Sequence, residues 1–342
     1  MNTQAPTHRP SRITRAVALL EYLAPAWFAM VMGWCGLSLA WLRATDVLGD
    51  TALGLGLVGS IFALCMFVLL CMACVVRLTF HPNAVAADMR HPVRHAFMAT
   101  LPLSIMLLAG IGVSLFWHTS RTLDTLLTFA WVLGSVLELA ASVWVLTRWL
   151  NTADNGGLQW AAFTPVFFIP VIGNVLAPLA GVTIGLESWA TAQFGIGLLL
   201  WPVLQTMLII RMVQAGPLAA RMSPSIFITM VAPSIIGLCF LQLDAPLSLA
   251  WGSWGIGLFF LMLSLTQIRT IFEQPFGLPH WAMSFPMAAF TTLSLRMSQE
   301  RGGAWLALPA TLLLAATSLL IVGLTLQTWH GLRHGHLLVA EK

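Results

Sequence analysis

Ten long apolar stretches, separated by short polar breaks, constrain this chain more than any other feature of its sequence. A helix needs about 20 apolar residues to cross the hydrocarbon core of a bilayer. Because no water is available there to satisfy backbone groups, a helix is the conformation that such a stretch takes. The sequence therefore predicts an all-α integral membrane protein with ten transmembrane helices, at roughly 24–43, 52–77, 97–117, 125–148, 162–184, 189–212, 225–243, 247–268, 278–296 and 303–327.

The composition excludes a soluble protein. Only 8% of the residues are charged, whereas a soluble domain carries about 25%. The 15 tryptophans suit the belts found at membrane–water interfaces. A net charge of +4 can indicate a nucleic-acid partner in a soluble protein. Here the basic residues lie in short loops and report topology, so we expect the lipid bilayer as a partner and no nucleic acid.

The basic residues also predict an orientation, since they gather in cytoplasmic loops. With a cytoplasmic N-terminus, twelve of the 16 Lys and Arg residues are inside and four, Arg43, Arg121, Arg296 and Arg301, are outside. An even number of crossings then makes both termini cytoplasmic. We expect an N-terminal tail over 1–20, a transmembrane domain over 21–329 and a C-terminal tail over 330–342.

Prolines recur in every odd-numbered stretch, within it or near its start, at Pro25, Pro102, Pro170, Pro233 and Pro286. Proline removes one helical hydrogen bond and clashes with the preceding turn. Such breaks are tolerated at membrane depth where the backbone is buried in protein or faces a water-filled cavity. The pattern favours five helical hairpins with their kinked members innermost. The alternative is that proline is simply common in membrane helices.

Glu138, in "VLGSVLELAASVW", is the acidic residue that lies deep within a stretch. An intramembrane carboxyl group suggests function, and this one could carry a proton for coupled transport. It could also be structural, hydrogen-bonded to Ser135 or Ser142, which share its helix face at spacings of three and four residues. Because the fourth stretch is even-numbered, we expect the structural role.

Arg77, Arg90 and Arg94 lie in or beside the break between the second and third stretches. Basic residues at a pore mouth raise the local concentration of anions. The alternative is that they only set the topology.

Histidines and cysteines give little sign of chemistry. His91 and His95 stand four residues apart, a spacing that can present two ligands to a metal, but no Cys or acidic set completes the site although Asp88 is near. We expect no metal or cofactor, and buried inert thiols at all five cysteines. A membrane-embedded enzyme that uses the His pairs for haem or a metal is an alternative, and it would require metal in the purified protein. We expect no enzyme.

Five segments, taken in order, resemble the tellurite-resistance/dicarboxylate transporter family, which includes a bacterial tellurite-resistance protein and the slow-type anion channels of plants. Each alone is weakly specific, but each falls at the matching odd-numbered span. They are "PAWFAMVMGWCGLSLAW", "HPVRHAFMATLP", "TPVFFIPVIGNVLAP", "SPSIFITMVAPS" and "WAMSFPMAAF".

The resemblance implies ten helices arranged as five hairpins around a central pore, with the odd-numbered helices lining it, and a homotrimer in the bacterial inner membrane. It also implies that a phenylalanine on the ninth helix plugs the pore. The matching residue is Phe285, directly before Pro286; without the resemblance it would be interpreted as a packing residue. The implied function is passage of small inorganic or organic anions. The alternative is a proton-coupled carrier of C4-dicarboxylate, sulfite or tellurite oxyanions.

Overall fold

The computed structural model describes residues 17–150 and 160–339, and within these ranges every regular element is a helix. Residues 1–16 of the expected N-terminal tail and 340–342 of the expected C-terminal tail lie outside the described residues. The last helix, α16 (Ala307–Arg333), continues into the segment expected to be the C-terminal tail.

Five α-helices in the middle of the molecule each follow directly on a 3₁₀ segment. The pairs are η2 (Pro25–Trp27) with α2 (Phe28–Arg43), η3 (Arg94–Ala99) with α6 (Thr100–Phe116), η5 (Pro165–Phe168) with α9 (Ile169–Leu176), η6 (Ala220–Met230) with α12 (Val231–Gln242), and η7 (Leu278–Met283) with α15 (Ser284–Gln299). In the chain, each of these five pairs is followed by a long helix. These helices are, in order, α4 (Asp50–Phe80), α7 (Arg121–Leu150), α11 (Glu187–Ala215), α13 (Leu247–Leu265) and α16.

Among the shorter elements, η1 (Leu20–Tyr22) precedes η2, and the others lie between the long helices. These are α3 (Thr45–Leu48), α5 (Pro82–Arg90), η4 (Trp160–Ala162), α10 (Pro178–Gly181), α14 (Ile268–Glu273) and η8 (Ala304–Leu306).

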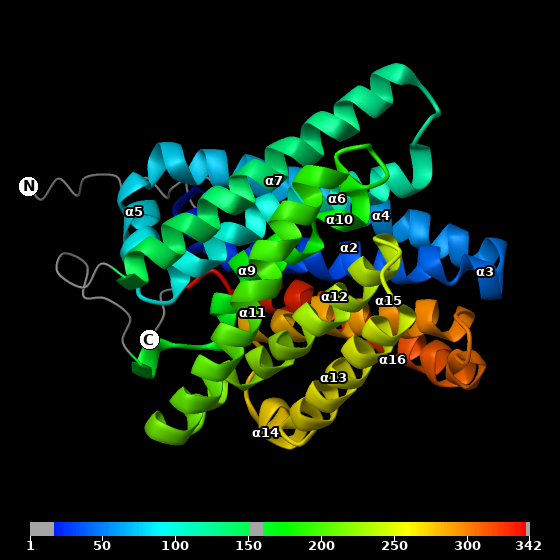
Figure 1. Ribbon diagram of the computed structural model, residues 1–342. Coiled ribbons are helices and arrows are strands. Elements are labelled where there is room, and N and C mark those ends of the chain that lie inside the picture. The colour runs from blue at the N-terminus through cyan, green and yellow to red at the C-terminus, as the bar shows by residue number, and fades with distance from the viewer. Residues whose placement is uncertain (1–16, 151–159, 340–342) are drawn as a thin grey trace, which may run out of the picture.

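The five helices α2, α6, α9, α12 and α15 close a ring by packing on one another. α2 packs against α6 and α15, α9 packs against α6 and α12, and α12 packs against α15. Each also packs against the long helix that follows it, so that α2 pairs with α4, α6 with α7, α9 with α11, α12 with α13 and α15 with α16. Figure 1 shows how the chain turns back between α2 and α4: α3 joins the two helices at the end of the molecule opposite α5.

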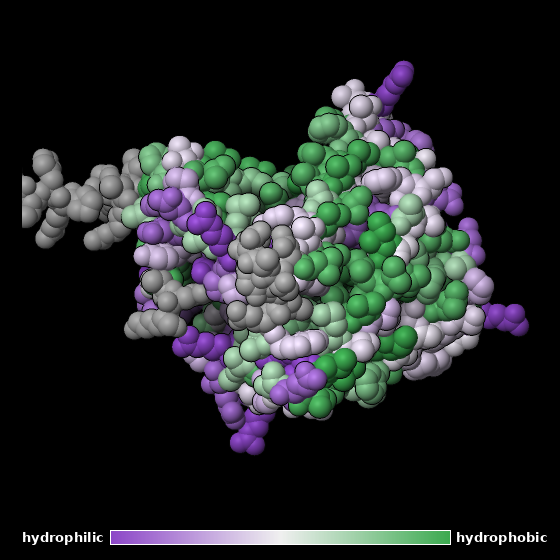
Figure 2. All heavy atoms as spheres, turned by 60° about the vertical axis from the view of Figure 1, so that its left-hand side comes forward, coloured by the Kyte–Doolittle hydropathy of each residue, from purple (hydrophilic) through white to green (hydrophobic). Residues whose placement is uncertain are grey.

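Burial separates the ring from the helices outside it. In the candidate spans that contain α2, α6 and α12, between 61% and 83% of the most apolar window is buried, against 17% to 33% in those formed by α4, α7, α11, α13 and α16. The outer helices are nevertheless strongly apolar, and hydrophobic side chains cover much of the face in Figure 2 while hydrophilic ones gather towards its edges. An exterior of this kind suits lipid, since large exposed apolar surfaces are rare on soluble monomers.

Eight helices among the described residues are long and apolar enough to cross a membrane, which is two fewer than the ten expected stretches. The fifth stretch is shorter, a helical segment over Pro165–Gly181. The ninth is divided between η7 and α15, and its α-helix carries five Ser and Thr residues and Arg296 among 16 positions, which lowers its hydropathy. Both segments belong to the ring, where protein rather than lipid surrounds them.

Indole N–H groups tie the last helix to the ring. Trp34 and Trp41 of α2 donate to the hydroxyls of Thr325 and Ser318 on α16, both at 3.1 Å. Trp281 of η7 donates to Thr328 on the same helix at 2.9 Å. A buried indole is satisfied in this way, and hydroxyls between helices are a common source of such contacts in membranes.

Candidate functional site

A cavity of about 280 Å³ lies where the five ring elements begin, and we call it the proximal cavity. Every ring element contributes to its wall, which is mainly apolar. Arg94, His91, Thr164 and Ser225 add polar groups. Because the chain enters each ring element from this side, the partial positive charge of the helix N-terminal ends is directed towards this cavity.

A second cavity of about 490 Å³, the distal cavity, lies towards the other end of the same five helices. Its wall is richer in polar groups, which are Arg43, Thr45, Ser114, Thr183, Gln242 and Thr292. The two cavities therefore follow one another along the inside of the ring.

Phe285 is the residue common to the two cavity walls among the described residues. It is the second residue of α15, and its side chain is almost fully buried at 4% exposure. α2 approaches closely at this level because it carries Gly36. A Cβ added there would lie 3.0 Å from the Phe285 ring and 2.8 Å from Ala288. The ring of Phe285 thus lies between the two cavities, against the backbone of α2.

The prolines lie at the start of the α-helices rather than in their middle. Pro102, Pro170, Pro233 and Pro286 are each the second or third residue of their ring helix, directly after the 3₁₀ segment, and Pro25 opens η2. Each α-helix continues without a break from its 3₁₀ segment, so the proline removes an N–H donor where the helix changes its hydrogen-bonding pattern. The ring elements change from 3₁₀ to α at these positions, close to the level of Phe285 in the ninth segment.

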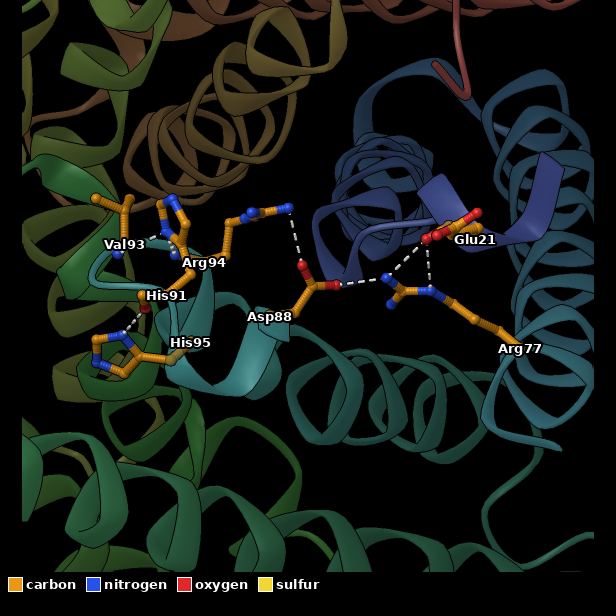
Figure 3. Close-up of polar contacts among 7 residues, drawn as sticks. All are labelled: Glu21, Arg77, Asp88, His91, Val93, Arg94 and His95. Atoms are coloured by element: carbon orange, nitrogen blue, oxygen red, sulfur yellow. Dashed lines mark hydrogen bonds and ion pairs between the residues drawn. The ribbon is translucent and has the colours of Figure 1, made fainter. Parts of the chain in front are cut away.

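Asp88 organises the basic residues beside the proximal cavity. Its carboxylate lies 2.7 Å from Arg77 Nη2 and 2.9 Å from Arg94 Nη1, between the two guanidinium groups in Figure 3. Arg77 also donates to the Glu21 carbonyl at 3.0 and 3.2 Å. Asp88 and Arg77 are buried, whereas Arg94 is half-buried and lines the cavity. Arg90 is exposed and lies outside both cavity walls.

Sequence reasoning considered Asp88 only as a neighbour of possible metal ligands. A signal was present, because Asp88 is the one acidic residue in a break that also contains Arg77, Arg90 and Arg94. Burial in a helical segment beside several cations favours an ion pair.

His91 and His95 are both committed to the backbone through Nδ1. His91 Nδ1 accepts from the N–H groups of Val93 and Arg94, both at 3.1 Å. His95 Nδ1 lies 2.9 Å from the His91 carbonyl, as Figure 3 shows, and the ring packs against Trp144 and Phe167. These contacts shape the turn that presents Arg94 to the cavity.

Glu138 is fully buried on α7. The prediction that Ser135 or Ser142 forms a hydrogen bond with its carboxyl group is wrong. Ser135 donates to Gln193 Oε1 at 2.6 Å, and Ser142 donates to the carbonyls of Pro170 and Glu138. Among the described residues neither carboxyl oxygen of Glu138 has a hydrogen-bond partner.

The side chain of Glu138 instead packs against Gly173 of α9, where an added Cβ would overlap the carboxyl group. The sequence could not reveal this partner, because the two residues lie on helices that meet only in the fold.

We predict that Gly173→Ala lowers the melting temperature, since overpacking costs about 1–3 kcal/mol. The matched control is Gly195→Ala on α11, where an added Cβ meets nothing within 4 Å and no loss is expected. Adding Glu138→Ala to Gly173→Ala should recover much of the loss because it vacates the overlapped space. Thermal melting of Gly173→Ala, Glu138→Ala, their double variant and Gly195→Ala in detergent measures this coupling, and simple additivity would contradict the packing described.

Comparison with known proteins supports the resemblance seen in the sequence. A family model described as "SLAC1: Voltage-dependent anion channel" matches residues 22–329. An uncharacterized transporter of Methanocaldococcus jannaschii is 25% identical over 308 residues, which cover 81% of this chain and 84% of that protein. The S-type anion channel SLAH2 of Arabidopsis thaliana is 25% identical over 242 residues, or 70% of this chain and 45% of the channel. A tellurite resistance protein TehA homolog of Haemophilus influenzae is 22% identical over 273 residues, 78% and 79% of the two chains.

Proposed function

This chain belongs to the SLAC1 family of voltage-dependent anion channels, and from that premise we propose that it passes small anions through the centre of its five-helix ring. In this proposal the chain crosses the membrane ten times as five hairpins, and Phe285 is the gate. The observation that carries the proposal is the pair of cavities on the inside of the ring, whose walls have Phe285 in common.

The electrostatics of the proximal cavity support an anionic substrate. Helix N-terminal ends attract anions, and Arg94 adds a cation at the cavity wall. A fixed Lys or Arg in the middle of the path would hold an anion tightly, whereas conduction requires binding weak enough for release. Phe285 is flanked in α15 by the uncharged residues Ser284 and Pro286, which suits weak binding at the proposed gate.

We place the proximal cavity on the cytoplasmic side of a bacterial inner membrane, with both termini on that side, because the larger share of Lys and Arg lies in the loops there. The assembly we propose is a homotrimer, by the family resemblance. No cofactor, metal or catalytic step is part of this function.

The test is current recording in a planar bilayer with nitrate, chloride, sulfite and malate in turn. A channel should carry anion current down the electrochemical gradient, and the current should persist when a protonophore collapses the proton gradient. Absence of anion current or uptake under every condition would overturn the proposal.

A second candidate function is a proton-coupled anion carrier, and one observation favours it: the carboxyl group of Glu138 is buried without a hydrogen-bond partner among the described residues. Buried polar groups are normally paired, and an exception calls for an explanation. We keep the structural role because Glu138 packs behind α9 and lines neither cavity.

We therefore predict that Glu138→Gln leaves anion uptake and its pH dependence nearly unchanged, since an uncharged carboxyl group and an amide have the same shape. The measurement is uptake into proteoliposomes between about pH 5.5 and 8, where a coupled proton site would titrate. Glu138→Leu should mainly lower the yield or the melting temperature. Loss of uptake or of its pH dependence in the Gln variant alone would favour the carrier.

A further inference from the structure

The distal cavity contains one charged side chain among the described residues of its wall, Arg43. This residue ends α2 and is part of the cavity wall. The other polar groups of the wall are uncharged hydroxyls and an amide. The distal cavity is larger and more polar than the proximal one.

The helix dipoles oppose the binding of an anion in the distal cavity, so that a cation such as Arg43 is needed there. Four of the ring helices, α2, α6, α9 and α12, line the distal cavity with residues at or towards their C-terminal ends, which carry partial negative charge, whereas α15 lines it with residues of its N-terminal half. An anion is attracted by N-terminal ends in the proximal cavity but is repelled by C-terminal ends in the distal one. A cation on the wall offsets that repulsion, and Arg43 is positioned to supply it.

Among the residues that the structure describes, Arg43 has most of its hydrogen-bonding capacity available to a ligand. Its recorded acidic contact is with Asp46, at 3.9 Å, and the Asp46 side chain is itself 62% exposed. Asp46 also accepts a hydrogen bond from Gln299. The neighbouring acid Glu300 is paired with Arg296 at 3.0 Å. A guanidinium group has five N–H donors, so a single long contact uses little of that capacity.

Three of the neutral groups on the wall, those of Thr45, Thr183 and Gln242, are also weakly engaged, whereas Ser114 and Thr292 donate to backbone carbonyls at 2.9 Å. Thr45 Oγ1 has no hydrogen-bond partner among the residues that the structure describes. Gln242 Nε2 and Thr183 Oγ1 lie 3.5 Å apart, at the outer limit of a hydrogen bond. These groups can turn towards a ligand without breaking strong contacts.

We propose that the distal cavity is a binding site for an oxyanion, held by Arg43 and by the hydroxyl and amide groups of Thr45, Thr183 and Gln242. The planar guanidinium group matches two oxygens of one anion, as in nitrate, sulfite or a carboxylate, better than it matches a spherical halide. A volume of about 490 Å³ accommodates such an anion together with water. The inference rests on the proposed function only in taking anions as the ligand class.

The test is isothermal titration of the purified, detergent-solubilised protein with nitrate, sulfite, malate and chloride at constant ionic strength. Arg43→Gln should raise the Kd for the oxyanions by about tenfold or more, the usual effect of losing a hydrogen bond to a charged group. Thr183→Val, which conserves shape, should raise it by a smaller factor and serves if Arg43→Gln does not fold. The matched control is Arg121→Gln, which removes an exposed arginine outside both cavity walls.

Equal Kd values for wild type and Arg43→Gln would overturn the inference. Binding that is lost in Arg94→Gln but kept in Arg43→Gln would also overturn it, because the anion would then lie in the proximal cavity. Chloride binding as tightly as the oxyanions would overturn the assigned ligand class, and no measurable binding to wild type would overturn the site. A separate recording of anion current distinguishes failure of this inference from failure of the proposed function. Current without Arg43-dependent binding sinks this inference alone, whereas binding without current sinks the proposed function alone.

Discussion

Phe285→Ala should raise anion current through the purified protein by about tenfold or more. A tenfold rise corresponds to removing about 1.4 kcal/mol from the barrier to passage. The expected cause is steric: the ring lies between the proximal and distal cavities, and an alanine there leaves a connected space. The measurement is current recording in a planar bilayer at matched protein density.

Phe290→Ala is the matched control for this experiment. Phe290 is also a buried phenylalanine of α15, but it stacks on Trp254 and lines neither cavity. Its removal should lower the melting temperature without raising the current. A correctly assembled Phe285→Ala protein that conducts like wild type would show that Phe285 is a packing residue.

Asp88→Asn should lower the free energy of unfolding by about 3–5 kcal/mol, because removing one partner of a buried ion pair leaves the other charge uncompensated. Arg77 is the charge left behind, with a side chain only 6% exposed. Arg94 is 33% exposed and can turn to water, so it adds less to the loss. The measurement is thermal or denaturant unfolding in detergent, with the asparagine conserving the size of the side chain.

Glu273→Gln offers the comparison with a surface pair. Glu273 lies 3.0 Å from Arg269 on α14, but both side chains are well exposed, and such pairs contribute about 0–1 kcal/mol. We expect little change in stability for this variant. A similar small change for Asp88→Asn would mean that the buried cluster does not hold the first ring elements together.

Local patterns in the sequence predicted those features of the fold that depend on composition alone. The long apolar stretches appear as helices, and stretches with more uniform hydropathy, such as 52–77, appear as single long helices. The segments around Pro170 and Pro286 differ from the expected uniform spans, since each is divided into a 3₁₀ and an α part. Hydropathy measures transfer to lipid and is insensitive to such a change of backbone within protein surroundings.

The position of Phe285 in the ninth stretch could be chosen only through the family resemblance, because a buried phenylalanine has no distinguishing local signal. Asp88 had a weak signal in its basic surroundings. Gly173 packs on Glu138 from another helix, while Gln193 and Asn174 bond to Ser135 and Ser142 of α7, and nothing local to Glu138 indicates these contacts. Contacts between stretches distant in the chain therefore mark the limit of what could be predicted.

The ring is closed by the contact between α2 and α15, the first and last of its helices in chain order. During synthesis, a chain that has emerged only as far as α13 contains four of the five ring helices, and the position of α15 between α2 and α12 is still open. The indole donors on α2, Trp34 and Trp41, find their acceptors on α16, which is made last. The ring of helices around the two cavities is thus complete only after α15 has been made. A ribosome that stalls before the final hairpin leaves a partial product whose unfilled seam is open to lipid or to quality-control proteases.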